Sequence, residues 1–361
     1  MARTSAASSL LARRLATQGV SQSLGGSVLE SVRHLLAVQA QDHYASLWAL
    51  GLRTRDADEA TVERAVRDRL IVRSWPMRGT LHLVAAEDLR WMLSLMAARI
   101  IGLDRARIER DFGLHEQALG RCRDAVVRVL EGGRALSRPT LYAALAARGI
   151  DIAGPRGLQI LGRLAHEGLI CQGPREGKQP TFVLLDEWLA PQPTLDRDEA
   201  LAMLARRYVA GHGPASVRDL AWWSGLTLSD AQRAWDLARS DLETLQHDGV
   251  EYAFVERGLA EAKPAIYLLP AFDEYLVGYA DRAPMIPPQH HRRVVCANGL
   301  FNPTVIIGGR VAATWKRELR KDRVDITLAP LRALNASERK AIARAARDYG
   351  RFLGLPVQLD T

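Results

Sequence analysis

The sequence predicts an α+β fold that is mainly helical and ends in an antiparallel β-rich part. Up to residue 262, segments with apolar residues at helical spacing alternate with pairs of short strand-like runs. From Lys263 onward the spacing becomes that of strands. The chain has 361 residues, which is more than one hydrophobic core usually holds. We therefore expect four segments, at residues 1–115, 116–195, 196–262 and 263–361.

The first segment begins with two predicted helices. Leucines at positions 10, 11 and 15 suit an amphipathic helix that packs on the domain. Ser27 and Glu30 have the spacing of a capping box, which marks the start of a second helix. The side chains that follow at intervals of three or four residues lie on one face of a continuous helix: Val32, Leu36, Gln39 and His43.

Two glutamines stand at the end of this predicted helix. Val32 and Leu36 indicate that the shared face is buried, so Gln39 enters the interior. A buried amide without partners costs about 1–3 kcal/mol. Gln41 points about 200° away on an ideal helix, so both amides can serve one site only if the helix ends or distorts near Ala40. The alternative is that these amides bridge backbone groups between helices.

The stretch Arg73–Val84 has the alternation of a strand, with Pro76 near its start. One face is apolar and the other carries hydrogen-bond donors, with Met77, Leu81 and Leu83 opposite Arg78, Thr80 and His82. A row of arginine, threonine and histidine can contact phosphates. A solvated face of a two-sided sheet is the alternative.

The second segment has the element order of a winged helix-turn-helix. Ser137 is a candidate N-cap with Pro139 in the first helical turn, and another helix runs over Gly157–Gly168. The strand-like runs Leu169–Gln172 and Thr181–Leu185 follow, separated by a glycine-rich turn. Helix, helix, strand, turn and strand is the order that such a module requires.

The third segment predicts a helix-turn-helix again. A first helix ends at the break Gly211–Pro214, and Ser216 and Asp219 have capping-box spacing for the next helix. Thr227 or Ser229 caps a third helix. Tandem modules of this kind occur in regulators and in enzymes, so the architecture alone does not decide the function.

The fourth segment predicts a small antiparallel sheet or barrel followed by a helix. Asn298–Gly299 and Gly308–Gly309 are expected hairpin turns, because such turns need positive φ. The expected strands and the final helix are, in order, Ala265–Leu269, Val294–Cys296, Val305–Ile307, Arg310–Trp315, Val324–Leu328 and Ser337–Tyr349.

Charge favours a polyanionic partner. The formal net charge is +8, although 41 acidic residues mean that any basic surface depends on how the charges are distributed in space. Two basic clusters of the fourth segment are candidate phosphate contacts, His290, His291, Arg292 and Arg293 in one and Lys316 and Arg317 in the other. The neighbouring pair Met285–Ile286 could form an apolar tip that wedges into a minor groove. The alternative for each cluster is a solvated loop.

Several kinds of site are disfavoured by the motifs that the chain lacks. It has no Walker-type glycine loop, no His-Glu-x-x-His and no Gly-x-Ser-x-Gly. Asp273 and Glu274 are adjacent, so in a strand they would face opposite sides and could not form a paired-carboxylate site. Cys122, Cys171 and Cys296 are scattered, so we expect no metal, no other cofactor and a reducing cytoplasm. No apolar run is long enough to span a membrane.

Three motifs together resemble those of a known enzyme family. They are Gln39-Ala-Gln41 followed by Asp42, the stretch Trp75–Val84, and Leu269–Tyr275. In this order they are similar to the AlkZ-like, or YcaQ-like, winged-helix DNA glycosylases. The resemblance covers the whole chain and implies three tandem winged-helix motifs in a C-shaped arrangement with a C-terminal β-rich part. A related branch carries aspartate at the second catalytic position, where this chain has Gln41.

The resemblance implies that Gln39 and Gln41 are catalytic, with Asp42 as a candidate third member. We expect the donor row near the amides and the two basic clusters, the latter from their charge, to bind DNA. It implies excision of N7-alkylated purines and unhooking of interstrand crosslinks, in DNA repair or in self-resistance to a genotoxic natural product. The substrate would be double-stranded DNA with an alkylated guanine or adenine, bound by a monomer. The alternatives are a non-catalytic winged-helix transcriptional regulator and a paralogue that has lost activity.

Overall fold

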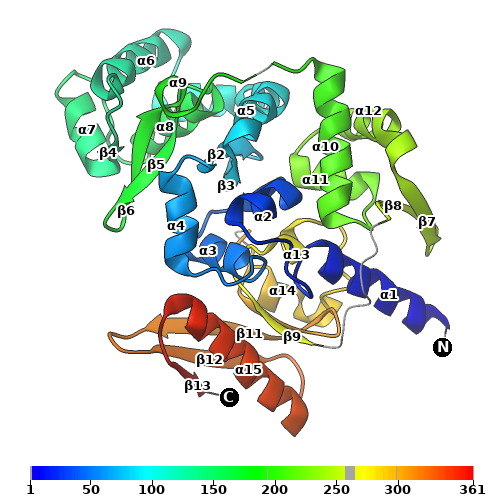
Figure 1. Ribbon diagram of the computed structural model, residues 1–361. Coiled ribbons are helices and arrows are strands. Elements are labelled where there is room, and N and C mark those ends of the chain that lie inside the picture. The colour runs from blue at the N-terminus through cyan, green and yellow to red at the C-terminus, as the bar shows by residue number, and fades with distance from the viewer. Residues whose placement is uncertain (1, 193, 257–264, 298, 361) are drawn as a thin grey trace. The chain divides into compact units, whose positions relative to one another are not determined.

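The computed structural model of this protein describes residues 2–192, 194–256, 265–297 and 299–360 (Figure 1). The chain divides into two compact units. Unit 1 comprises Met1–Val62, Leu201–Trp223 and Thr227–Thr361, and unit 2 comprises Glu63–Ala200 and Ser224–Leu226. Helices and largely antiparallel strands make up both units, which confirms the predicted α+β class. The four predicted segments refer to winged-helix modules and not to compact units, so their boundaries stay a prediction.

Unit 1 contains most of the elements at the two ends of the chain. Its helices are α1 (Ala2–Thr17), α2 (Val28–Leu35), α3 (His43–Gly51), α10 (Arg197–His212, which begins in unit 2), α11 (Val217–Ser224, whose last residue belongs to unit 2), α12 (Leu228–Ala238), α13 (Glu274–Val277), α14 (His291–Val294) and α15 (Ala336–Leu353). Its strands are β1 (Ala37–Gln39), β7 (Glu243–His247), β8 (Val250–Phe254), β9 (Ile266–Leu269), β10 (Thr304–Ile307), β11 (Arg310–Leu319), β12 (Val324–Pro330) and β13 (Val357–Asp360).

The C-terminal part of unit 1 is a five-stranded sheet with the order β13-β12-β11-β10-β9. All its pairs are antiparallel except β12 with β13. Gly308 and Gly309 turn β10 into β11 with φ of 57° and 80°, as the sequence predicts. Helix α15 begins at a capping box formed by Asn335 and Glu338, and it packs on β9.

Two helical features of unit 1 confirm local predictions. Leu10, Leu11 and Leu15 of α1 are buried, so this helix packs on the domain through its apolar face. Helices α10, α11 and α12 are followed by the β7–β8 hairpin, which gives the predicted helix-turn-helix a wing. The hydroxyl of Ser216 and the carboxylate of Asp219 form the predicted capping interaction, and Thr227 caps α12.

Unit 2 holds the second winged helix and a hairpin that precedes it. Its helices are α4 (Glu59–Arg67, which begins in unit 1), α5 (Leu89–Phe112), α6 (Glu116–Leu130), α7 (Arg138–Ala146), α8 (Arg156–His166) and α9 (Leu185–Trp188). Its strands are β2 (Ile71–Met77), β3 (Thr80–Ala85), β4 (Leu136–Ser137), β5 (Ile170–Glu176) and β6 (Gln179–Leu184), which lie in the order β3-β2-β5-β6-β4.

The second winged helix is built around an apolar core. Helices α6, α7 and α8 bury leucine, isoleucine and valine side chains against β5 and β6, among them Val126, Leu141, Ile160 and Leu164. Gly177, with φ of 58°, closes the β5–β6 hairpin, which is the wing. The predicted element order of this module is thus present in the structure.

One of the strands predicted in the fourth segment is absent from the structure. Val294–Cys296 is not a strand, because Val294 is the last residue of α14, and Val295 makes only a single bridge to Phe301. Of the predicted Asn298–Gly299 turn, Asn298 lies outside the described residues. Within the part of the chain that the structure describes, no helix has the length and apolar character needed to cross a membrane.

Candidate functional site

The glutamine motif does not lie on a helix, contrary to the prediction of a continuous helix from Ser27 to His43. Ser27 and Glu30 do form the predicted capping box, but α2 ends at Leu35. The chain turns at Leu36, whose φ of 66° is unusual for a leucine, and continues into the short strand β1. Because the helix is broken before Gln39, the condition that both glutamines can serve one site is met.

The motif ends at the N-terminus of α3. Asp42 is the N-cap of this helix, and its Oδ1 accepts a hydrogen bond of 3.1 Å from the backbone N–H of Ala45. Gln39 is only 8% exposed, whereas Gln41 and Asp42 are exposed. The segment therefore passes from the interior to the surface over three residues.

The main chain of Gln39 is held by a buried carboxyl group. Its N–H donates a hydrogen bond of 2.8 Å to Oε1 of Glu274, which is fully buried. The other oxygen, Oε2, accepts 2.9 Å from Trp223 Nε1 and lies 3.3 Å from His212 Nε2. Trp223 and His212 are also fully buried, so Glu274 joins three separate segments of unit 1 in one hydrogen-bonded cluster.

Asp273 fixes the turn from which Glu274 projects. It forms a bidentate ion pair with Arg53, 2.8 Å for each oxygen, and both side chains are fully buried. Oδ1 of Asp273 also accepts 2.9 Å from the N–H of Tyr275 and thereby caps α13. Asp273 and Glu274 are therefore at the start of a helix, and the strand considered for them from the sequence is wrong. They still do not form a carboxylate pair over a shared substrate position.

Arg317 differs from the loop residue that the sequence predicted. It is half-buried on β11, its guanidinium lies 5.1 Å from the ring centroid of Tyr44, and it donates to the hydroxyl of Tyr349. Burial raises the pKa of Tyr349 to about 12, so this phenol stays protonated at neutral pH. These side chains and Asp42 line a small pocket of about 40 Å³. Arg317 is thus brought together with the motif and not with an exposed basic cluster.

The predicted row Arg78, Thr80 and His82 is not the face of one strand. Arg78 and Gly79 form the turn between β2 and β3, with φ of 55° and 68°. His82 is fully buried in β3, where its Nδ1 lies 2.9 Å from the carbonyl of Thr80 and its Nε2 accepts from Arg78 Nη2 at 3.1 Å. His82 is therefore placed to orient Arg78, which is half-exposed. All three residues belong to unit 2.

The remaining predicted DNA contacts lie on the surface of unit 1. His291, Arg292, Arg293 and Lys316 are exposed, and His290 is half-buried. Arg293 donates 3.2 Å to the carbonyl of Pro330. The predicted apolar tip is wrong, because Met285 and Ile286 are 0% and 1% exposed and belong to the core. Exposed basic side chains are therefore available for phosphate contacts, but Met285–Ile286 is not available as a wedge.

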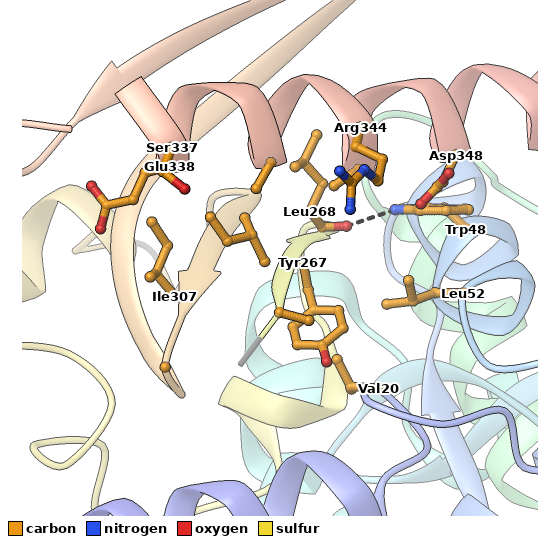
Figure 2. Close-up of a pocket in the computed structure, with 15 residues that line it drawn as sticks. Val20, Trp48, Leu52, Tyr267, Leu268, Ile307, Ser337, Glu338, Arg344 and Asp348 are labelled. Carbon is orange, nitrogen blue, oxygen red and sulfur yellow. Dashed lines mark hydrogen bonds between the residues drawn. The ribbon is translucent and has the colours of Figure 1, made fainter. Parts of the chain in front are cut away.

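A larger cavity lies between α15 and the strands β9 and β10 (Figure 2). Its volume is about 560 Å³, and Trp48, Leu268, Arg344 and Asp348 are among the residues that line it. Nε1 of Trp48 donates 2.8 Å to the carbonyl of Leu268 at its edge. None of the predicted catalytic residues lines this cavity, so its size does not make it the active site.

Neither metal ligands nor a thiol pair mark a different site. Within the described ranges there is no group of three or more His, Cys, Asp or Glu side chains that could hold a metal ion. Cys122 and Cys171 are buried and Cys296 is partly buried, all as free thiols. Sequence reasoning missed Glu274, His212 and Trp223. The only signal was the Leu269–Tyr275 motif itself, because the partner of Gln39 lies 235 residues further along the chain.

Comparison with known proteins gives a consistent result. The model of the family described as DNA glycosylase AlkZ-like matches residues 32–352. A protein from Streptomyces sahachiroi described as an interstrand DNA cross-link repair glycosylase is 29% identical over 310 residues, which cover 80% of this chain and 82% of the relative. The solved structure of the DNA glycosylase AlkZ from Streptomyces sahachiroi has a TM-score of 0.79 at 26% identity and covers 98% of this chain and 99% of that chain.

The family match begins within α2 and ends within α15, and so includes the glutamine motif, both winged helices described above and the C-terminal sheet. The structural match extends over nearly all of the rest. This protein belongs to the AlkZ-like family of DNA glycosylases.

Proposed function

We propose that this DNA glycosylase excises N7-alkylated purines from double-stranded DNA, and that Gln39 and Gln41 carry the reaction. The observation that supports the proposal most directly is the course of the chain through the motif. The break at Leu36 removes Gln39–Asp42 from a helix, and the next three residues lead from a buried amide to an exposed amide and an exposed carboxyl group.

An alkylated purine explains why amides suffice in place of a strong acid. Guanine alkylated at N7 carries a positive charge, so it leaves as a neutral base with the electrons of the C1′–N9 bond. Water then bonds to C1′ and one proton is released to solvent. Gln39 and Gln41 orient this water and direct their carbonyl dipoles towards the cationic sugar of the transition state. Asp42 assists from the N-cap of α3.

We include interstrand crosslinks among the substrates. A purine that is crosslinked to the opposite strand cannot be flipped fully out of the duplex, unlike the substrate of most glycosylases. An enzyme for such a lesion must act at an accessible surface. The exposure of Gln41 and Asp42, and the small volume of the pocket that Asp42 and Tyr44 line, agree with that requirement. The name of the Streptomyces sahachiroi relative, an interstrand DNA cross-link repair glycosylase, supports it as well.

The remaining parts of the proposal concern how the protein meets its substrate. We propose that it acts as a cytoplasmic monomer and that the exposed side chains of His291, Arg292, Arg293 and Lys316 contact DNA phosphates. Arg78, oriented by His82, and Thr80 contribute a second set of DNA contacts from unit 2. Arg317 acts beside Asp42, through its contacts with Tyr44 and Tyr349.

The direct test is excision of a single N7-methylguanine from a duplex oligonucleotide. Abasic sites are converted to strand breaks by mild alkali and counted under single-turnover conditions. We expect the wild-type protein to produce them, and we expect Gln39→Ala and Gln41→Ala each to slow excision by about 100-fold, equivalent to about 2.7 kcal/mol of transition-state stabilisation. DNA affinity should change by no more than about twofold, because neither amide is proposed to contact phosphate.

Gln117→Ala is the matched control. Gln117 is an exposed glutamine in the first turn of α6, in unit 2, and its substitution should leave the rate unchanged. No abasic sites with the wild-type protein, on either the monoadduct or a crosslinked duplex, would refute the proposed substrate. Full activity of both glutamine variants would refute the catalytic role.

A further inference from the structure

We propose that Glu274 is a positioning residue of the active site, which acts by fixing the main chain of Gln39. The inference rests on the catalytic role proposed for Gln39. Glu274 is fully buried and therefore does not touch the substrate. Its effect on excision must pass through the residue that it holds.

The carboxyl group of Glu274 has a different task for each oxygen. Oε1 accepts the N–H of Gln39 at 2.8 Å. Oε2 accepts Nε1–H of Trp223 at 2.9 Å and lies 3.3 Å from Nε2 of His212. Hydrogen bonds to both oxygens fix the rotation of the carboxyl group about its terminal bond. The N–H of Gln39 thus has an acceptor whose position is set from two other segments.

The groups around Oε2 are themselves held firmly. The ring of His212 stacks on Tyr208 with a centroid separation of 4.7 Å and packs 5.2 Å from the ring of Trp223. Position 278 has to be glycine for the close approach of α13 and His212, because a Cβ there would lie 2.8 Å from the imidazole. Asp273 and Arg53 fix the start of α13 with their buried ion pair.

Each of the two chain segments that meet at this hydrogen bond contains a non-glycine residue with positive φ. Leu36, three residues before Gln39, has φ of 66°, and Phe272, two residues before Glu274, has φ of 58°. Such conformations of non-glycine residues are unfavourable by about 1–3 kcal/mol and persist only where tertiary contacts determine them. The hydrogen bond between Gln39 and Glu274 joins these two segments directly. It therefore helps to hold Leu36 and Phe272 in their unfavourable conformations.

The consequence for the reaction is geometric. A catalytic amide must be aligned with water and C1′, and a displacement of about 1 Å can cost about 100-fold in rate. Glu274→Gln keeps the shape of the side chain but places an NH₂ group opposite either the N–H of Gln39 or Nε1–H of Trp223. One of these two hydrogen bonds is then lost.

We therefore expect Glu274→Gln to slow single-turnover excision of N7-methylguanine by about 10- to 100-fold while the Kd for the same DNA stays within about twofold. Glu338→Gln is the matched control. Glu338 also accepts a backbone N–H, that of Asn335, at 3.0 Å, but it caps α15 and should leave the rate unchanged. If the rate of Glu274→Gln equals that of Glu338→Gln, the inference is wrong.

A double-mutant cycle with Gln39→Ala separates positioning from a general structural effect. If Glu274 acts through Gln39, the double variant is no slower than Gln39→Ala alone. Losses that multiply would overturn the inference. Should Glu274→Gln not fold, Trp223→Phe enters the same cycle, since it removes only one hydrogen bond to Oε2 and keeps an aromatic ring. An inactive wild-type protein would refute the proposed function, whereas an active one with an uncoupled cycle would refute only the role of Glu274.

Discussion

The interior around Gln39 and the core of the second winged helix differ in the kind of side chain that they bury. The core between α6, α7 and α8 is apolar, and the charged cluster on α6 and at the end of α8 is only half-buried or exposed, with Arg123, Glu116 and Glu167 as its members. Around Gln39 the interior contains Glu274, His212 and the ion pair of Arg53 with Asp273. Buried charges cost desolvation energy, and apolar side chains of the same volume often stabilise a fold as well or better.

We infer that the two interiors serve different purposes. An apolar core tolerates small shifts of its parts, because dispersion contacts have little directional preference. Hydrogen bonds between buried polar groups require defined distances and angles. The polar interior around Gln39 therefore specifies the position of one backbone segment more narrowly than apolar packing would. In the second winged helix, no buried catalytic segment is proposed, so apolar packing is sufficient.

The largest expected effect comes from breaking the buried ion pair. Asp273→Asn leaves the fully buried guanidinium of Arg53 without its counter-charge, and we expect the free energy of unfolding to fall by about 3–5 kcal/mol. Urea denaturation followed by tryptophan fluorescence measures it. Glu109→Gln is the control, because it removes an exposed pair with Arg105 on α5 and should cost about 0.5 kcal/mol or less. If the free energy of unfolding falls equally in the two variants, the buried ion pair is no more important for stability than the exposed one.

A smaller effect is expected from His166, the last residue of α8. Burial lowers its pKa to about 4, and Nε2 has no hydrogen-bond partner among the described residues. The unfolded chain, with a histidine pKa of about 6.5, binds the proton more tightly, so stability present above pH 6.5 is lost as the pH falls towards 4. Between pH 6.5 and 5 we expect a loss of at most about 2 kcal/mol.

His166→Asn should abolish this part of the pH dependence. Burial raises the pKa of Glu167, but its hydrogen bonds with Arg123 and Arg163 outweigh burial and keep the pKa below its usual range. A hydrogen bond with Arg123 likewise lowers the pKa of Glu116. These carboxylates stay ionised down to pH 5 and do not contribute in that interval. Urea denaturation of both proteins at pH 6.5 and pH 5 gives the comparison. An identical pH dependence in the variant would mean that the buried imidazole is not responsible.

The elements that the sequence predicts correctly have local signals. Ser27 with Glu30 and Ser216 with Asp219 mark helix starts, and Gly308–Gly309 marks a turn, because each interaction joins residues that are close along the chain. The class and the order of the elements follow from such signals, together with the periodicity of the apolar residues.

The errors arise where tertiary contacts override local preference. Leu36 adopts positive φ, which nothing about a leucine in a helical pattern indicates. Arg78 and Gly79 form a turn within a stretch whose alternation predicts a single strand. The glycine was the one local signal for this turn. Met285 and Ile286 were expected to form an exposed apolar tip, yet both are buried.

The candidate site was predictable only in part. The types and spacing of Gln39, Gln41 and Asp42 made them candidates, and burial of Gln39 followed from the apolar residues before it. The identity of the group that holds Gln39 could not follow, because Glu274 lies 235 residues further along the chain and reaches it only in the folded state. A local pattern carries no information about such a partner.

The smallest expected effects on stability belong to the exposed charges, which act on DNA instead. Arg292→Ala, Arg293→Ala and Lys316→Ala should each change the free energy of unfolding by less than about 0.5 kcal/mol. If each side chain contacts one phosphate, each substitution should flatten the slope of log affinity against log salt concentration by about one unit, whatever the DNA sequence. Excision at saturating enzyme should be nearly unchanged, because these groups do not touch the glycosidic bond. Binding is measured by fluorescence anisotropy at several salt concentrations.

Arg317→Ala provides the contrast within the same strand as Lys316. Its guanidinium is half-buried against Tyr44 and bound to Tyr349, beside Asp42, so its loss should slow excision more than it flattens the salt slope. The reverse result, a changed slope with a normal rate, would make Arg317 a phosphate contact like its neighbour. Unchanged slopes for all four variants would mean that DNA does not bind over α14 and β11.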